Sequence, residues 1–311
     1  MTLRLAEPIA RHSIASDHPV QLATPLLEVH PGLLLKFESD NPGGSHKVRA
    51  ARFIVRSAIA SGDIVPGHTT VIEKTGGNFG FGLALACQAH NVPVELAVGL
   101  EFSAVKRRCL ELFGARLIGL DMLERGATPR EVVEWHLEQA NELERHYFYT
   151  DQFHNPASVA AHELETGPEI AMQLKAWPEV KKLTFVSCAG TGASLTGIAT
   201  ALKHAGYAVD VVLVEPQGCD SRNGIFTSHK LEGMSVGVVP PFLDWNLINE
   251  VRTVSHEEAM ETRQTLARTL GFIAGNTAAA CLTVAHTLAR SASCEHKVLS
   301  LMYDHGLWYL R

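Results

Sequence analysis

Two patterns of apolar and polar positions alternate along the chain. Short apolar runs predict buried strands at residues 33–37, 69–73, 94–98, 116–120, 183–187, 209–214 and 297–302. Apolar residues at helical spacing predict helices at residues 45–59, 78–89, 102–113, 129–145, 157–174, 193–204, 256–269 and 276–289. Because repeated strand–helix alternation is typical of parallel sheets covered by helices, we predict the α/β fold class.

A break in this alternation at residues 151–156 suggests two domains, and 311 residues suffice for both. We predict a smaller N-terminal α/β domain of residues 41–150. Residues 1–40 plus 151–311 are expected to form a larger C-terminal α/β domain, with the active site in the cleft between the two. Residues 1–32, apart from 24–27, are expected to be irregular, and residues 216–244 read as loop.

Composition excludes several classes of function. The net charge of -6 argues against nucleic acid as a partner, and Arg49, Arg52 and Arg56 are interpreted as a solvated or interface stripe. No apolar run is long enough to span a membrane, and no signal core is recognised. Six scattered cysteines without a Cys-x-x-Cys pair favour reduced thiols in the cytoplasm. The sixteen histidines show no His-Glu-x-x-His spacing, so we expect no metal site.

A turn-forming loop, Asn-Pro-Gly-Gly at residues 41–44, delivers Lys47 to the first turn of a predicted helix. Ser45 is a favourable N-cap for that helix. The positive end of a helix favours the neutral, nucleophilic form of a lysine. On this stretch alone, a solvated surface lysine explains the pattern equally well.

A glycine-rich loop at residues 73–80 follows a predicted strand and opens a helix. Because Gly76 and Gly77 have no side chains, their backbone N–H groups are accessible, and Thr75 and Asn78 add side-chain donors. Ligands bind at such strand ends, so a carboxylate site is one interpretation. An ordinary tight turn with an Asn cap is the other.

Two further loops open helices. Residues 190–197 present backbone N–H groups to a phosphate. With Glu215 after the next strand they imitate a dinucleotide motif, but the glycine spacing is too long, so a compact phosphate fits better.

At residues 274–280, alanines permit close approach of something flat, and Thr277 offers a hydroxyl; close helix packing explains the same pattern. Together the lysine, phosphate loop, carboxylate loop and hydroxyl match the needs of pyridoxal phosphate.

From residue 24 to residue 310 the chain resembles the cysteine synthase/cystathionine β-synthase family of fold-type-II pyridoxal-phosphate enzymes. The matching motifs are Asn-Pro-Gly-Gly-Ser-x-Lys at 41–47, Gly-Thr-Gly at 190–192, Thr-Gly-Pro-Glu-Ile at 166–170 and the stretch 229–234. The resemblance implies two three-layer αβα domains with mostly parallel sheets, like the tryptophan synthase β-subunit. The cofactor-binding residues that it implies are Lys47, Asn78, Gly190, Thr191, Gly192, Ala193, Ser194 and Thr277. The substrate-binding residues are Thr75, Gly76, Gly77, Phe79, Gln152 and Gly233.

The activity that the resemblance implies is β-replacement on an O-activated serine or a similar amino acid. It proceeds through an aminoacrylate to cysteine or a non-standard β-substituted amino acid, in a cytoplasmic homodimer. Lys47 is the implied Schiff-base lysine and general base. A neutral hydroxyl at Thr277 suits β-chemistry better than transamination. No regulatory tail or haem-binding extension is recognised, which argues against a full cystathionine β-synthase.

Departures from the family pattern leave the substrate open. Gly76 and Phe79 replace a serine and a threonine of the carboxylate loop, and Val48 replaces an acid. We expect Phe79 to reshape the pocket, so the substrate is not fixed as O-acetylserine. β-Elimination by an ammonia-lyase or desulfhydrase on the same cofactor stays open. So do a non-catalytic protein that binds pyridoxal phosphate and a nicotinamide oxidoreductase.

Overall fold

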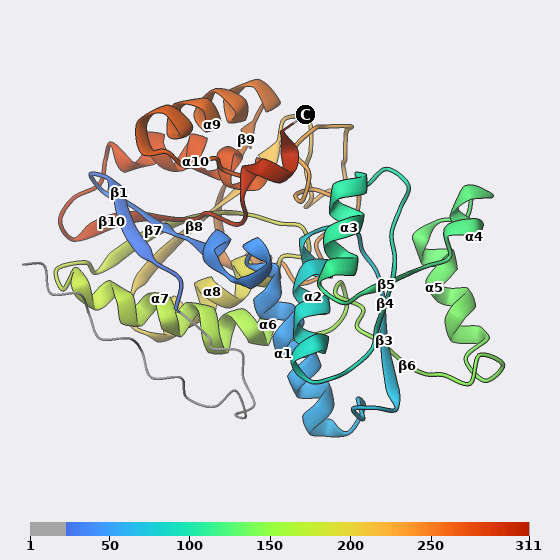
Figure 1. The fold of residues 1–311 in the computed structure, drawn as a ribbon. Coiled ribbons are helices and arrows are strands. Elements are labelled where there is room, and N and C mark those ends of the chain that lie inside the picture. Colours follow the sequence, from blue (N-terminus) through green and yellow to red (C-terminus); the bar gives the residue numbers. More distant parts are fainter. Residues whose placement is uncertain (1–22, 311) are drawn as a thin grey trace, which may run out of the picture.

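The computed structural model describes residues 23–310, whose strands form two sheets (Figure 1). The larger sheet contains, in order, β1 (Leu26–His30), β2 (Leu33–Lys36), β10 (His296–Leu301), β7 (Lys182–Cys188), β8 (Ala208–Pro216) and β9 (Ile248–Val254). Its pairs are parallel except β1 with β2. Figure 1 shows α9 (His256–Leu270) and α10 (Asn276–Ala289) on one face of this sheet. On the other face lie α6 (Ala157–Ala161), α7 (Gly167–Gln173) and α8 (Ala193–His204).

The smaller sheet is parallel throughout and contains, in order, β5 (Arg116–Ile118), β4 (Val94–Ala97), β3 (Thr69–Lys74) and β6 (His146–Tyr149). One face is covered by α1 (Lys47–Ser61), α2 (Asn78–Ala89) and α3 (Ala104–Leu112). The other face is covered by α4 (Leu120–Glu124) and α5 (Pro129–Glu138). Each sheet is therefore the middle layer of three, which confirms the predicted α/β class.

Elements with continuous apolar runs or complete amphipathic faces lie where the sequence predicts them. Three helices, α2, α8 and α10, have the predicted bounds. The inner strands β7 and β8 are buried over nearly their whole length, as expected of strands covered on both faces. Exposed and irregular segments were predicted less well.

The sequence pattern did not predict strands β1, β6 and β9, or helix α4. Strands β1 and β9 are the two edges of the larger sheet and are partly exposed, so they lack a continuous apolar run. The helix predicted over residues 129–145 ends at Glu138, and the chain turns at Glu144 with a φ of 51°. Strand β6 begins two residues later, at His146.

The strands of the smaller sheet all fall between residues 69 and 149, and those of the larger sheet fall outside that range. This division agrees with a smaller domain of residues 41–150. We therefore keep the predicted domain boundaries as a proposal.

The chain that leads to Lys47 is fastened to the end of the larger sheet. The backbone N–H of Ser39 donates to Met302, and that of His46 donates to Tyr303, at 2.8 and 3.0 Å. Ser45 is extended rather than helical, so α1 begins at Lys47, two residues later than predicted. The Ser45 hydroxyl still accepts the N–H of Lys47 at 3.3 Å. Lys47 is thereby held where the strands of the larger sheet end.

Candidate active site

Lys47 lines two neighbouring cavities. One is an open cleft of about 1310 Å³, and the other is a small cavity of about 40 Å³. Lys47, Asn78, Gly190, Thr191 and Gly233 line both. Burial lowers the pKa of Lys47 from 10.5 to about 8, against a smaller opposing effect of Cys188. Desolvation is thus the main cause of the shift that the sequence attributed to the helix end.

The predicted phosphate loop borders the small cavity. Gly190, Thr191, Gly192 and Ser194 line it, while Ala193 is buried and donates its N–H to the Thr191 hydroxyl at 3.3 Å. Gly192 has a φ of 87°, and a Cβ there would lie 2.5 Å from the backbone nitrogen of Leu243. The loop therefore requires glycine at this position, and it presents the N-terminus of α8 to the cavity.

Thr277 and Asn78 line the same cavity from the starts of α10 and α2. The amide of Asn78 donates to Oδ2 of Asp304 at 2.5 Å, and the Tyr309 hydroxyl donates to the same oxygen at 2.5 Å. Burial raises the pKa of Asp304, although these two donors oppose the shift. No local sequence pattern marks Asp304 as a site residue. Its carboxyl lies against Gly275, where a Cβ would come within 1.7 Å of Oδ1.

His46 is a second residue that the sequence analysis missed. It precedes Lys47, lines the small cavity and is half-buried, and its buried Nδ1 has no hydrogen-bond partner among the described residues. Burial and the charge of Lys47 lower the pKa of His46 well below its ordinary value, so the ring is neutral. Only the position beside Lys47 in the sequence hinted at it.

These residues fit the cofactor that the sequence implies. Two residues that line the small cavity, His46 and Asp304, each have a buried polar atom, Nδ1 and Oδ1 respectively, without a hydrogen-bond partner within residues 23–310, which is costly unless a ligand supplies one. The glycine loop and the N-terminus of α8 suit a phosphate, and Asn78 and Thr277 suit polar atoms of a ring. Pyridoxal phosphate would supply an aldehyde for attachment of Lys47 and an electron sink for charge at the substrate Cα.

The predicted substrate residues line the open cleft: Thr75, Gly76, Gly77, Phe79, Gln152 and Gly233. Phe79 is only 3% exposed and packs into the core of the smaller sheet, so its ring contributes to that core as well as to the lining of the cleft. A Cβ at Gly76 would lie 2.6 Å from both Phe102 and Val98. The aromatic ring of Phe102 therefore occupies the space that a serine side chain would take at position 76. The sequence pattern did not predict this role of Phe102.

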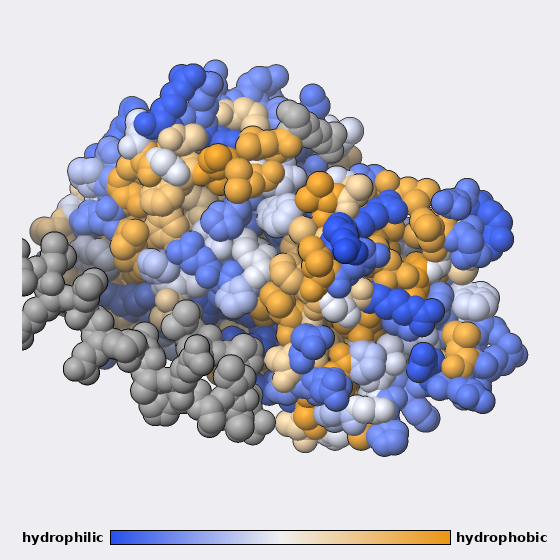
Figure 2. All heavy atoms as spheres, viewed as in Figure 1, coloured by the Kyte–Doolittle hydropathy of each residue, from blue (hydrophilic) through white to orange (hydrophobic). Residues whose placement is uncertain are grey.

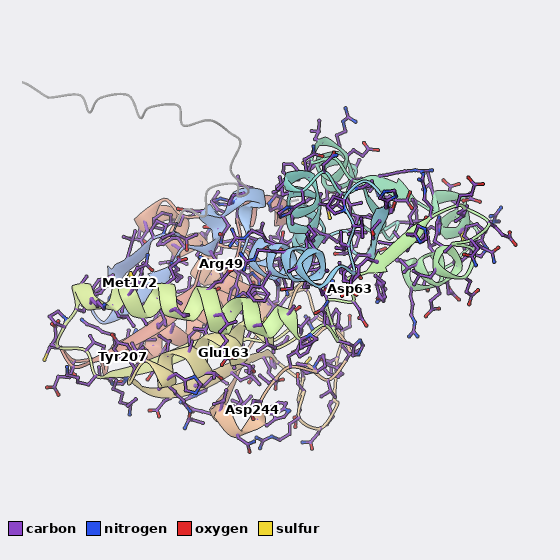
Figure 3. All side chains as sticks on the ribbon, turned by 90° about the horizontal axis from the view of Figure 1, so that it is seen from below. Arg49, Asp63, Glu163, Met172, Tyr207 and Asp244 are labelled. Carbon is purple, nitrogen blue, oxygen red and sulfur yellow. The ribbon has the colours of Figure 1, made fainter. Side chains whose placement is uncertain are left out.

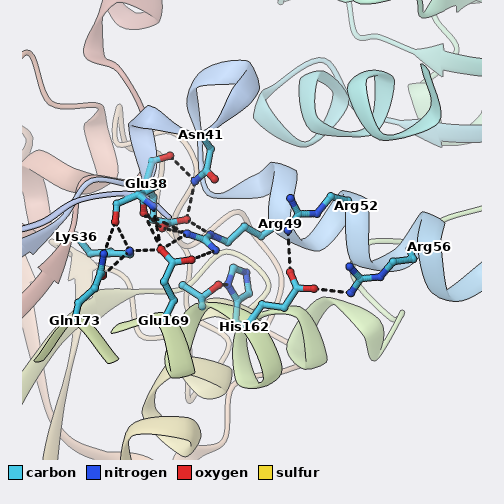
Figure 4. Close-up of polar contacts among 12 residues, drawn as sticks. Lys36, Glu38, Asn41, Arg49, Arg52, Arg56, His162, Glu169 and Gln173 are labelled. Atoms are coloured by element: carbon cyan, nitrogen blue, oxygen red, sulfur yellow. Dashed lines mark hydrogen bonds and ion pairs between the residues drawn. The ribbon is translucent and has the colours of Figure 1, made fainter. Parts of the chain in front are cut away.

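A buried ionic cluster of Lys36, Glu38, Arg49 and Glu169 lies behind the lysine loop (Figure 4). Arg49 donates to Glu38 at 2.6 Å and to Glu169 at 2.8 Å, and Lys36 also donates to Glu169. Figure 3, seen from below, shows Arg49 between α1 and the helices beneath the larger sheet. The cluster joins β2, α1 and α7, so it fixes the helix that carries Lys47.

Of the two interpretations of the arginine stripe, a solvated face is wrong for Arg49 and Arg52, whereas an interface face agrees with their packing. Arg49 is 1% exposed, and Arg52 and Arg56 both pair with Glu165 on the π-helical turn His162–Thr166. Arg49 and Arg52 therefore face a second layer of helices, while the side chain of Arg56 stays 36% exposed. Since periodicity alone does not reveal where acids from elsewhere in the chain lie, the pairing needed the tertiary structure.

Within residues 23–310, no group of three or more histidine, cysteine or acidic side chains is arranged to hold a metal ion. No helix in this range combines the length and apolar character needed to cross a membrane. All six cysteines are free thiols, four of them buried.

Comparisons with known proteins identify the family. A family model described as pyridoxal-phosphate dependent enzyme matches residues 18–304. A cysteine synthase from Staphylococcus aureus is 32% identical over 281 residues, which cover 89% of this chain and 86% of that protein. The structure resembles an O-ureido-L-serine synthase with a TM-score of 0.80, 30% identity and coverage of 93% and 90% of the two chains. It also resembles a hydrogen sulfide-producing enzyme from Fusobacterium nucleatum, with a TM-score of 0.80, 28% identity and coverage of 92% and 95%. The chain therefore belongs to the family of pyridoxal-phosphate-dependent enzymes, near its cysteine synthase branch, and its cofactor is pyridoxal phosphate.

Proposed function

We propose that the protein replaces the β-substituent of an O-activated serine or a similar amino acid, with Lys47 as the attachment point of the cofactor and as the general base. The observation that carries the proposal is the placement of Lys47. Its buried amine, with a pKa of about 8, separates a phosphate-sized cradle from a cleft lined by a carboxylate-type loop. A base with a pKa near the working pH takes up and returns a proton most efficiently.

The residues around Lys47 have different roles according to where they lie. The loop of residues 190–194 and neutral His46 face the cavity that suits a phosphate. Thr75, Gly76 and Gly77 offer backbone N–H groups and a hydroxyl to the α-carboxylate of the substrate in the open cleft. With the carboxylate so held, Lys47 Nζ would remove the proton at Cα of the substrate.

Replacement of Lys47 by alanine tests this proposal. Loss of the proton transfer alone lowers turnover by about 10²–10⁴-fold, and the visible absorbance of the lysine-bound cofactor disappears. Lys203→Ala, an exposed change at the end of α8, is the matched control and leaves both unchanged. A Lys47→Ala enzyme with wild-type turnover contradicts the assignment.

β-Elimination is the second candidate function. It is supported by the two aromatic rings at the carboxylate loop, Phe79 and Phe102, which reduce the room for a second substrate. It is also the kind of chemistry suggested by the name of the hydrogen sulfide-producing relative. Product analysis separates the two: elimination releases ammonia and a keto acid without any added nucleophile, whereas replacement consumes one.

We also propose a cytoplasmic homodimer. Support for the location comes from the six free thiols. Support for self-association comes from hydrophobic side chains that gather over α10 in Figure 2 and from exposed apolar residues nearby, such as Leu27 and Leu270. Light scattering on the purified holoenzyme tests the stoichiometry, and a monomeric mass at micromolar concentration rejects the dimer.

A further inference from the structure

Asp304 lies where three supports of the small cavity meet. It follows strand β10, and its backbone forms an antiparallel bridge with Ser45 in the loop that delivers the cofactor lysine. Its carbonyl accepts the N–H of Gly275 at 3.2 Å, where α10 begins. Its side chain accepts the amide of Asn78 at 2.5 Å, where α2 begins. The lysine loop and the starts of two helices are thus joined through one residue.

The two helices belong to different sheets. Figure 1 shows α2 beside the smaller sheet and α10 on the larger one. Asn78 is the first residue of α2 and Thr277 is the second residue of α10, and both line the small cavity. A ring that is bound by both needs them at a fixed separation. Because each helix packs on its own sheet, that separation depends on contacts between the two halves of the molecule, and the bond from Asn78 to Asp304 is such a contact.

The carboxyl of Asp304 is held tightly against the start of α10. A Cβ at Gly275 would come within 1.7 Å of Oδ1, so the backbone there approaches the carboxyl more closely than any other residue allows. The N-terminal end of a helix favours an oxygen with negative charge. Two cations from other helices, Lys106 of α3 and Arg263 of α9, also act on the charge of Asp304. Both packing and charge therefore fix this carboxyl.

The carboxyl in turn fixes which way the amide of Asn78 points. The N–H₂ of Asn78 and the hydroxyl of Tyr309 both donate to Oδ2 of Asp304. Burial raises the pKa of Asp304, but Oδ2 accepts these bonds whether or not Oδ1 carries a proton. An amide nitrogen has two N–H donors. One is used by Asp304, and the other remains for an acceptor in the small cavity.

We propose that Asp304 is a positioning residue, which turns the N–H₂ of Asn78 towards an acceptor atom of the cofactor ring and holds it at a fixed distance from Thr277. Asp304 touches neither the substrate nor the reacting atoms and acts through Asn78. The inference rests on the placement of the cofactor in the small cavity, as in the proposed function, and is independent of whether replacement or elimination follows.

Asp304→Asn tests the proposal with little change of shape. The positive end of α10 favours the new amide oxygen at the place of Oδ1, so the new N–H₂ faces Asn78 and Tyr309. Asn78 must then turn its carbonyl oxygen to that N–H₂. An acceptor thereby replaces the donor that faces the ring.

Two measurements on the holoenzyme report this change apart from activity. Dialysis against decreasing concentrations of pyridoxal phosphate gives the affinity, and the visible absorbance of the bound cofactor reports the bond to its ring. We expect Asp304→Asn to weaken the affinity at least about tenfold, as for loss of a bond to a charged group, and to shift the visible band. Asn78→Ala should do the same. In the double variant, the second substitution should add less than about twofold, because the two residues act as one unit.

A second variant disturbs Asp304 without changing a polar group. Gly275→Ala places a methyl group at the position of Oδ1, and the φ of -63° at Gly275 suits alanine. It should displace the carboxyl and shift the band in the same direction as Asp304→Asn. Because it leaves the charge of Asp304 in place, it keeps the proposal testable if Asp304→Asn does not fold.

Two controls separate positioning from general support of the fold. Glu215→Gln changes another buried carboxyl, at the end of β8, which accepts the N–H of Ser221 at 2.9 Å and lines neither cavity. It should leave the affinity and the band unchanged, whatever it costs in stability. Tyr309→Phe removes one donor but leaves the bond to Asn78, so the affinity should fall less than about threefold.

Four results overturn the proposal: an unchanged band in both Asp304→Asn and Gly275→Ala, additive losses of affinity in the double variant, an equal loss in Glu215→Gln, or a loss in Tyr309→Phe as large as in Asp304→Asn. Lys47→Ala distinguishes this failure from failure of the proposed function. If Lys47→Ala keeps the visible band, the attachment at Lys47 is wrong, whereas coupled losses of affinity at Asp304 and Asn78 still support the positioning role. If Lys47→Ala loses the band but the coupling is absent, only this inference fails.

Discussion

The two walls of the cleft differ in how their polar groups are supported. We call the Lys47 side, with the 190–194 loop and Thr277, the lysine wall; the Thr75–Phe79 loop with Phe102 is the substrate wall. The lysine wall keeps its family motif and is backed by a buried ionic cluster. The substrate wall departs from its motif and is backed by aromatic packing. The contrast suggests that the cofactor chemistry is retained while substrate selection has changed.

The largest expected effect concerns the support of the lysine wall. Glu169→Ala leaves the buried cluster of Lys36, Glu38 and Arg49 with one uncompensated positive charge, so we expect a loss of about 3–5 kcal/mol in the free energy of unfolding. Chemical denaturation measures it. Asp121→Asn, which removes an exposed pair with Arg125, is the control and should cost less than about 1 kcal/mol. Similar losses in the two variants would show that burial of the cluster does not matter.

The pH dependence of the same cluster follows from Glu169. Burial alone raises the pKa of Glu169, but hydrogen bonds and charges from Arg49 and Lys36 lower it overall. The folded pKa lies below that of the unfolded chain. The stabilisation is therefore fully present above the unfolded pKa and is lost as the pH falls through the folded value. The stability difference between wild type and Glu169→Ala should shrink on acidification.

A second expected effect on the lysine wall has the opposite sign. Burial lowers the pKa of Lys47 from 10.5 to about 8, so Lys47→Met should stabilise the cofactor-free protein by about 3 kcal/mol at pH 7. Because the folded pKa is the lower one, this difference is complete below pH 8 and disappears as the pH rises from about 8 to 10.5. Denaturation of the cofactor-free variants at several pH values checks both sign and window. Destabilisation by Lys47→Met would contradict the assigned burial cost.

A smaller effect tests the packing of the substrate wall. Gly76→Ser restores the family residue but places a Cβ 2.6 Å from Phe102 and Val98, so overpacking should cost about 1–3 kcal/mol. In a Phe102→Leu background the same change should cost less, since the ring no longer fills the space. A double-mutant cycle of unfolding free energies measures the coupling. Additive costs would show that Gly76 and Phe102 are independent.

The smallest effect separates local stability from a role in the open cleft. Helices α5 and α9 both begin with a capping box, at Thr128 and Ser255. Thr128→Ala and Ser255→Ala should each cost about 1 kcal/mol by loss of the cap. Only Thr128 lines the open cleft, so only its substitution should raise KM for the amino-acid substrate. A change of KM in both variants would indicate a general loss of stability instead.

The sequence by itself determined the element types wherever burial is continuous along the chain. Helices α2, α8 and α10 and the inner strands were predicted because their apolar pattern is local. The edge strands β1 and β9 were missed because one side of each is exposed. Lys47 and its loop were predicted because the motif is contiguous.

Only the tertiary structure decided which groups surround those motifs. Asp304 reaches Asn78 across 226 positions of sequence, Arg49 meets Glu169 across 120, and Phe102 occupies the space beside Gly76. None of these contacts has a local pattern, because the partners come from different helices and strands. The physical reason is that periodicity records which side of an element is buried. It does not record what that side is buried against. The charge state of Lys47 and the room beside the substrate depend on those neighbouring groups.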